Sequence, residues 1–137
     1  MEIQTFMLCK ELRETGEGNL YDASGIGIYR FQSPESAFPL TATAPYYMLL
    51  RRPDRGPEKT VTLRMNLIDM DGNAIGAPQN IRVAFTFPGG SLFYSLVGRI
   101  DLSFPKIADY RLDITADEKT NPFFYQYDIE VILPPER

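Results

Sequence analysis

The residues that most often carry enzyme chemistry are sparse in this chain of 137 residues, which has no histidine and a single cysteine. Without imidazole, the common general base of hydrolases, the Ser-His-Asp and Cys-His nucleophile systems and histidine-containing zinc sites are excluded. One cysteine cannot supply the thiolate set of an iron–sulfur cluster. We therefore expect no catalytic residue, no cofactor and no resident metal.

The segment from Asp69 to Asn73 is the best candidate for metal binding. Asp69, Asp71 and Asn73 carry oxygen atoms at alternate positions, as the start of a calcium loop does. The match then fails, because the sixth position is Ala74 rather than glycine and the twelfth is Asn80 rather than glutamate. The aspartate-glycine step inside the segment tolerates left-handed backbone angles, so we interpret it as a hairpin turn.

Carboxylates and the lone thiol offer weaker candidates. Asp113 with Asp128 or Glu130 would form a pair for acid and base catalysis if their strands are neighbours. All three fall on the polar faces of predicted strands, where carboxylates usually serve solvation and the protection of strand edges. Cys9 ends an apolar run with no nearby base, so we expect a small buried side chain rather than a nucleophile.

Aromatic residues give the strongest binding signal. Because neighbouring residues of a strand point to opposite faces, Phe124 should be exposed if Tyr125 is not. Exposed tyrosines suit a protein interface or a platform for stacking sugars. The alternative is that a second sheet and the long loop cover both faces. The candidate binding surface comprises Tyr46, Tyr47, Phe124, Tyr125 and Tyr127.

Charge and hydropathy narrow the partners and the compartment. The formal charge of −4 argues against a nucleic-acid partner, which needs clustered cations. The basic cluster of Arg51, Arg52 and Arg55 is interrupted by Pro53 and Asp54, and we interpret it as a solvated loop. No apolar run approaches the roughly 20 residues of a membrane-spanning helix, so we expect no membrane partner. The unpaired cysteine and the absence of a signal-peptide pattern favour the cytoplasm, although an exported chain without its leader would look the same.

The elements that would position these residues are strands. An alternation of period two, which a helix cannot produce, is clearest over residues 60–67 and recurs near 81–87, 100–104, 110–117 and 123–133. About eight short strands without a helical period predict one domain over residues 1–137. Its predicted fold is an all-β, two-sheet antiparallel β-sandwich, immunoglobulin-like or jelly-roll-like. The apolar positions of the clearest strand are Val61, Leu63, Met65 and Leu67, and its polar positions are Thr60, Thr62, Arg64 and Asn66.

Two segments break the pattern. Residues 33–45 contain Pro34, Pro39 and Pro45, which predicts a long loop or an edge excursion with at most one helical turn near its start. Gly98 interrupts the apolar run over residues 92–104, where we expect the strand to bend or to change sheets.

Several short motifs follow one another in a recognisable order. They are Leu8-Cys9, Arg13-Glu14-Thr15-Gly16, Leu20 with Gly25-Ile26, Phe38-Pro39, the strand and turn of residues 61–72, and Ala108-Asp109-Tyr110-Arg111-Leu112. Together they resemble an uncharacterised family of small bacterial β-sandwich proteins with no assigned activity. Asp109-Tyr110 is also similar to the tyrosine corner of immunoglobulin-like sandwiches, although the paired cysteines and the core tryptophan of immunoglobulin domains are missing.

These observations favour a non-enzymatic β-sandwich that acts by protein interaction. The partner would be another protein or a second copy in a homodimer, contacted through an edge strand or an aromatic sheet face. The alternative is a β-sandwich that binds a small ligand or a carbohydrate through Tyr46, Tyr47 or the strand of Tyr125 and Tyr127. An enzyme without histidine is the third hypothesis and would need a pocket of clustered carboxylates.

Overall fold

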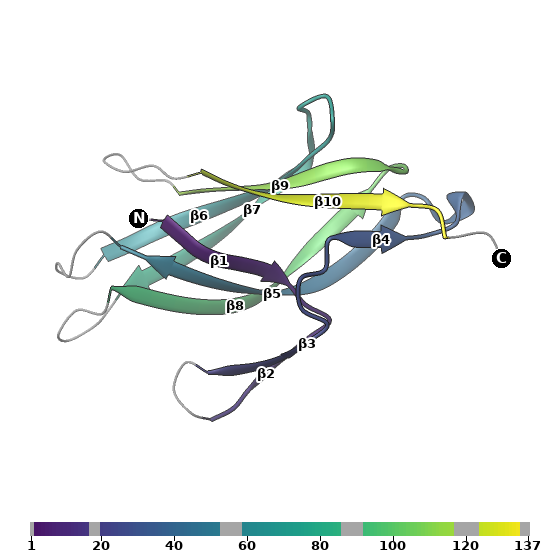
Figure 1. The fold of residues 1–137 in the computed structure, drawn as a ribbon. Helices are drawn as coiled ribbons and strands as arrows, with labels where there is room; N and C mark the ends of the chain where they lie inside the picture. Colours follow the sequence, from purple (N-terminus) through teal and green to yellow (C-terminus); the bar gives the residue numbers. More distant parts are fainter. Residues whose placement is uncertain (1, 17–19, 53–58, 86–91, 117–123, 135–137) are drawn as a thin grey trace.

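The computed structural model describes residues 2–16, 20–52, 59–85, 92–116 and 124–134, and these form an all-β sandwich (Figure 1). A single 3-10 turn, η1 (Glu35–Ala37), is the one helical element among the described residues. This turn confirms the prediction of at most one helical turn near Ser33. The strands are β1 (Glu2–Leu8), β2 (Glu11–Glu14), β3 (Tyr21–Ser24), β4 (Arg30–Gln32), β5 (Leu40–Arg51), β6 (Lys59–Ile68), β7 (Ala74–Phe85), β8 (Phe93–Phe104), β9 (Ala108–Ala116) and β10 (Phe124–Ile132).

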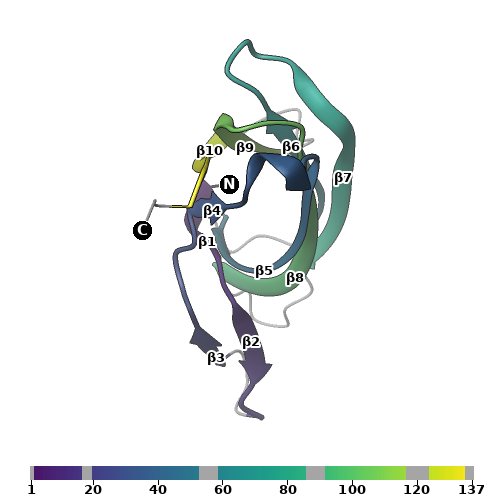
Figure 2. The same ribbon diagram turned by 90° about the vertical axis from the view of Figure 1, so that its right-hand side faces the viewer.

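Two sheets make up the body of the sandwich, as predicted. One has five strands in the order β4-β10-β9-β6-β7 and the other has three in the order β1-β5-β8. Neighbouring strands are antiparallel except β4, which runs parallel to β10. β2 and β3 form a separate two-stranded sheet that extends away from the body (Figures 1 and 2). The described strands exceed the predicted eight because β2, β3 and β4 are too short to show an alternating pattern.

The core lies between the two sheets. The apolar positions of β6 are buried, with Leu63 0% and Met65 2% exposed, while Arg64 between them is exposed. Leu112 and Ile114 of β9 pack into the same cluster as Met48 and Leu50 of β5. The alternation in the sequence therefore identified the buried apolar positions of β6 and β9 correctly.

Pro45 lies inside a strand rather than in the predicted loop. β5 begins at Leu40 and is the central strand of the three-stranded sheet. The backbone nitrogen and oxygen of one residue point to the same neighbour in an antiparallel sheet. The nitrogen of Cys9 donates to the oxygen of Pro45 at 2.8 Å, just beyond the last β1–β5 pair, Leu8 with Tyr46. Proline is tolerated here because its missing N–H would face the place where β1 has already ended.

Gly98 marks a close contact rather than a change of sheet. β8 runs from Phe93 to Phe104 and pairs with β5 throughout. A Cβ atom built on Gly98 would lie 2.5 Å from the hydroxyl oxygen of Tyr46 and 2.7 Å from its ring carbon Cζ. Glycine is needed because any side chain would collide with the buried Tyr46 ring.

A tyrosine corner is present at the start of β9. The Tyr110 hydroxyl donates to the carbonyl oxygen of Lys106 at 2.6 Å and accepts from the Lys106 nitrogen at 3.3 Å. The ring of Tyr110 is buried and lies 5.0 Å from that of Phe104. This contact ties the β8–β9 connection to the strand that follows it, as the motif predicted.

We predict that Gly98→Ala destabilises the protein by about 1–3 kcal/mol, because the added methyl overpacks the core against Tyr46. Urea unfolding followed by circular dichroism measures the change. The matched control is Ser95→Ala, on the opposite face of the same strand, which should change stability by less than about 0.5 kcal/mol. In a double-mutant cycle, Tyr46→Leu should remove most of the penalty of Gly98→Ala. A Gly98→Ala protein as stable as the wild type would contradict this account of the β5–β8 contact.

Candidate functional site

Tyr46 is a core residue and not part of a binding surface. It is 4% exposed, and its ring stacks on that of Phe6 with centroids 5.8 Å apart. Burial raises the pKa of its hydroxyl to about 12. The proposed use of Tyr46 as an exposed ring is therefore corrected, because residues 40–45 continue β5 and place Tyr46 on its inner face.

Tyr47 points to the outer face of the three-stranded sheet and is half-buried. The ring of Tyr21 from β3 meets it edge-on, with centroids 6.0 Å apart. Tyr47 thus serves as the point where the β2–β3 hairpin rests on the sandwich.

Tyr125 and Tyr127 face inward from β10 and are half-buried. Their ring centroids lie 6.3 Å and 5.3 Å from that of Phe6 in β1. The hydroxyl of Tyr127 also donates to the carbonyl oxygen of Ile28. These rings hold β1 beside β10, whereas Phe124 on the opposite face is 57% exposed. The exposure of Phe124 confirms the expected alternation, and it leaves one of the five candidates with a largely exposed ring.

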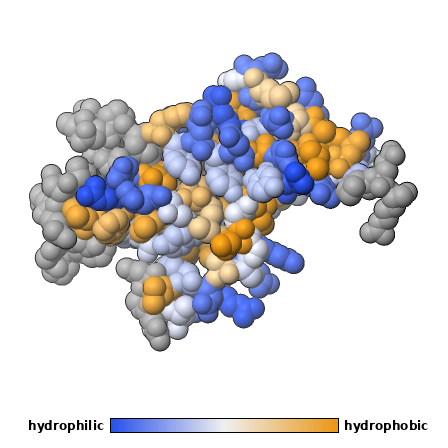
Figure 3. All heavy atoms as spheres, in the orientation of Figure 1, coloured by the Kyte–Doolittle hydropathy of each residue, from blue (hydrophilic) through white to orange (hydrophobic). Residues whose placement is uncertain are grey.

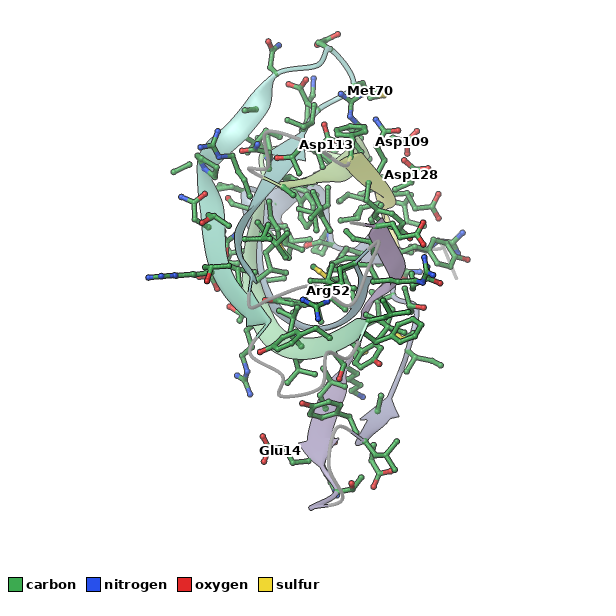
Figure 4. All side chains as sticks on the ribbon, turned by 90° about the vertical axis from the view of Figure 1, so that its left-hand side faces the viewer. Glu14, Arg52, Met70, Asp109, Asp113 and Asp128 are labelled. Atoms are coloured by element: carbon green, nitrogen blue, oxygen red, sulfur yellow. The ribbon has the colours of Figure 1, made fainter. Side chains whose placement is uncertain are left out.

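The β2–β3 hairpin, residues 11–24, is the most prominent surface feature and is named the arm below. Its two strands pair only with each other among the described residues, so each has one open edge. Leu20 on the arm is 62% exposed, and apolar surface on the arm is visible in Figure 3. Figure 4 shows Glu14 of the arm and Met70 of the β6–β7 turn at opposite ends of the molecule. The sequence analysis noted the Arg13-Glu14-Thr15-Gly16 motif but predicted neither the strands of the arm nor its projection, because β2 and β3 are too short to alternate.

A cleft of about 410 Å³ separates the arm from the three-stranded sheet. Pro45 and Val97 contribute apolar lining. The charged lining consists of three cationic side chains and one carboxylate, namely Lys10, Arg13, Arg99 and Glu11. Arg13 and Glu11 form an ion pair at 3.4 Å, both well exposed. The cleft is therefore more basic than the chain as a whole, whose net charge is −4.

A groove of about 380 Å³ lies on the outer side of β10. Its lining includes Tyr29, Asp109, Asp128 and Glu130. Glu130 pairs with Arg30, whereas Asp109 and Asp128 have no ion pair among the described residues. Figure 4 shows Asp109 and Asp128 on the same side of the sandwich. The groove is therefore acidic.

The carboxylates proposed for acid and base chemistry do not meet one another. Across the β9–β10 pair, Asp113 lies opposite Gln126, and Asp128 lies opposite Arg111. Asp113 is 8% exposed, contrary to its expected place on a solvated face, because β9 is an inner strand of the five-stranded sheet and Arg111 covers the carboxylate. The Arg111 Nε donates to both Asp113 oxygens, at 3.0 Å and 3.3 Å. Asp113 is thus engaged in a local ion pair.

The remaining chemical candidates have structural roles. One carboxylate oxygen of Asp69 accepts from the backbone nitrogens of Asp71 and Asn73, at 3.0 Å and 2.9 Å, which supports the hairpin-turn interpretation. Within the described ranges, no group of three or more Asp, Glu, Cys or His side chains could hold a metal ion. Cys9 is 1% exposed, and burial raises the pKa of its thiol.

The basic cluster is split by the fold. Arg51 pairs with Glu2 at 3.5 Å, and Arg52 is 3% exposed, so Arg52 does not lie in a solvated loop as expected. The nitrogen of Arg52 donates to the carbonyl oxygen of Leu92 at 2.9 Å, which anchors it at the end of the sandwich. Arg55 lies outside the described residues. In the described part of the chain, no helix has the length and apolar character needed to cross a membrane.

Comparison with known proteins adds little to this picture. No protein-family model and no curated protein matches the chain. A solved structure of a family 123 glycoside hydrolase from Clostridium perfringens is similar over 79% of this chain, with 17% sequence identity and a TM-score of 0.40. The match spans only 24% of that enzyme. Similarity at this level carries no argument about activity.

We predict that the burial of Tyr46 makes stability fall at high pH. The unfolded chain releases the phenolic proton near pH 10, while the native state retains it until about pH 12. The stabilisation is complete below the unfolded pKa and is lost as the pH rises through this window. Wild-type protein should lose about 1 kcal/mol more than Tyr46→Phe between pH 9 and pH 11, as measured by urea unfolding. Equal losses in the two proteins would contradict the buried, neutral state of this side chain.

Proposed function

We propose that this protein is a non-enzymatic β-sandwich module that binds another protein chain, and that the arm is its main contact element. The observation that carries the proposal is a projecting two-stranded hairpin with an exposed leucine, whose outer edges pair with no other described strand. Open strand edges pair readily with other chains, and proteins usually cover or blunt them. A projecting hairpin that keeps both edges open is suited to a partner that covers them.

The low intrinsic stability expected of an isolated hairpin also supports a role for the arm in binding a partner. A two-stranded hairpin alone is marginally stable in water and needs packing against a further element. The arm contacts the body where the ring of Tyr21 meets that of Tyr47 edge-on, and the hydrogen bond from the Lys10 nitrogen to the Ser24 oxygen, 3.0 Å long, closes the base of the hairpin. Burial of the 62% of Leu20 that is exposed would contribute about 1–2 kcal/mol, or roughly a tenfold change in affinity.

Several features of the chain support the non-enzymatic part of the proposal. The sequence has no histidine, and the Asp113 and Glu130 carboxylates are engaged by Arg111 and Arg30. A cytoplasmic location, which the unpaired cysteine favours, and an immunoglobulin-like subtype, which the Tyr110 corner favours, belong to the same proposal.

We predict that Leu20→Asp weakens partner binding at least tenfold. Wild-type and variant protein are used as affinity baits in cells of the organism that makes the protein, and the bound chains are quantified by mass spectrometry. Light scattering measures self-association separately. The matched control is Met70→Asp, because Met70 is 67% exposed and lies far from the arm. It should leave binding unchanged. This role for the arm would be ruled out if the protein is strictly monomeric and if Leu20→Asp weakens the binding of none of the captured proteins.

A further inference from the structure

One edge of the five-stranded sheet is only partly occupied by the chain's own backbone. β4 pairs with the end of β10, over Glu130 to Ile132. From Phe124 to Asp128, β10 pairs with β9 on one side and has no backbone partner on the other among the described residues. We call this segment, Phe124–Asp128, the free edge.

The hydrogen-bonding groups of the free edge can be identified by their direction. The nitrogen of Glu130 donates to the oxygen of Tyr29 at 2.8 Å, so the backbone groups of Glu130 point away from β9. Backbone groups two residues apart in a strand point the same way. The N–H and C=O groups of Asp128, Gln126 and Phe124 therefore face outward along the line of β4.

The space beside the free edge suits a single extended segment of a partner better than the edge of a whole second sheet. The segment that leads into β4 bridges the two sheets, because Gly27 and Ile28 donate to the oxygen of Leu8 in β1 at 2.9 Å and 3.0 Å, while Tyr29 accepts from Glu130. Figure 2 shows β4 between β10 and β1. β1 remains beside β10 further along, where Phe6 packs on Tyr125 and Tyr127. A second copy that presented its whole sheet would meet β1.

The side chains around the free edge indicate which residue types a bound segment of a partner should carry. On the inner side, the ring of Tyr125 is half-buried and packs on the buried ring of Phe6, so this side favours an apolar residue. On the outer side, Asp109 and Asp128 lie in the acidic groove without an ion-pair partner among the described residues. The exposed ring of Tyr29 lines the same groove, and its face already lies 5.6 Å from the guanidinium carbon of Arg30. A lysine or an arginine matches this outer side.

We propose that the free edge of β10 binds one extended segment of another protein, which continues the line of β4 with apolar residues inward and basic residues outward. Main-chain hydrogen bonds would provide affinity, and the acidic groove would select a basic segment. The inference deepens the proposed function, since it also assumes a protein partner, but it assigns a site distinct from the arm.

A peptide titration tests the proposal directly. The probe is an acetylated and amidated heptapeptide of alternating lysine and valine, followed by ¹H–¹⁵N correlation spectra of the full chain. We expect saturable shifts centred on the amides of Phe124, Gln126 and Asp128. An otherwise identical peptide of alternating glutamate and valine should bind at least tenfold more weakly. Shifts centred elsewhere, equal affinity for the two peptides, or no binding would overturn the proposal.

Two variants separate the backbone from the side-chain contribution. Gln126→Pro removes one outward N–H while leaving the pairing with β9 intact, and it should weaken peptide binding at least tenfold. Gln126→Ala, which keeps the N–H, should bind as the wild type does. The double variant Asp109→Asn and Asp128→Asn should lower the preference for lysine over glutamate at least fivefold, and it remains informative if the proline variant does not fold. An unchanged preference would overturn the assignment of the acidic groove.

Failure of this inference is distinguishable from failure of the proposed function. Leu20→Asp should leave binding of the lysine-valine peptide unchanged, because the arm is not part of the free edge. If the peptide binds as expected while no partner depends on Leu20, the free edge stands and the role of the arm is wrong. If binding of a partner depends on Leu20 while the peptide does not bind, the role of the arm stands and the assignment of the free edge is wrong.

Discussion

Within the described ranges no continuous hydrogen-bond ladder joins the two sheets of this sandwich at its sides, and side-chain contacts and the short segment that leads into β4 connect them instead. At one side the amide of Gln79 in β7 bridges to the backbone of Asp101 in β8, donating at 2.9 Å and accepting at 3.4 Å. At the other side the ring of Phe6 in β1 packs against Tyr125 and Tyr127 of β10. A barrel would have closed these sides and removed its edges. Because the sheets stay separate, backbone groups remain for the chain's own β4 and for a partner.

The strands could be predicted from the sequence wherever one face is dry and the other wet. In β6 and β9 the alternation identifies the apolar side chains that enter the core, because a period of two decides which face each of them occupies. The prediction failed where a distant contact decides the conformation. Pro45 is compatible with β5 only because β1 ends beside it, and Gly98 is required only because Tyr46 lies across from it. Neither partner is near in sequence, so local pattern could not reveal these roles.

The candidate site was less predictable than the fold for the same reason. Residue type alone identified aromatic rings as candidates for a binding surface. The burial of Tyr46 and the exposure of Phe124 depend instead on strand order and on the face of each strand. The open edge of β10 depends on sheet order alone, since β4 covers only its last residues. The arm pairs with no third strand among the described residues, and nothing in its local sequence pattern shows this. The sequence therefore identified aromatic strands as candidates without showing which of their side chains and edges are exposed.

The central claim is that β10 has one paired and one open edge over Phe124–Asp128, and amide hydrogen exchange measured by NMR tests it most directly. Because only one edge of this segment is paired, the exchange rates should alternate along the strand. The N–H groups of Tyr125 and Tyr127, which face β9, should exchange slowly, whereas those of Gln126 and Asp128 should exchange at least a hundredfold faster. Uniformly slow exchange of all four amides would show that this edge is already closed in the free protein and would contradict the account.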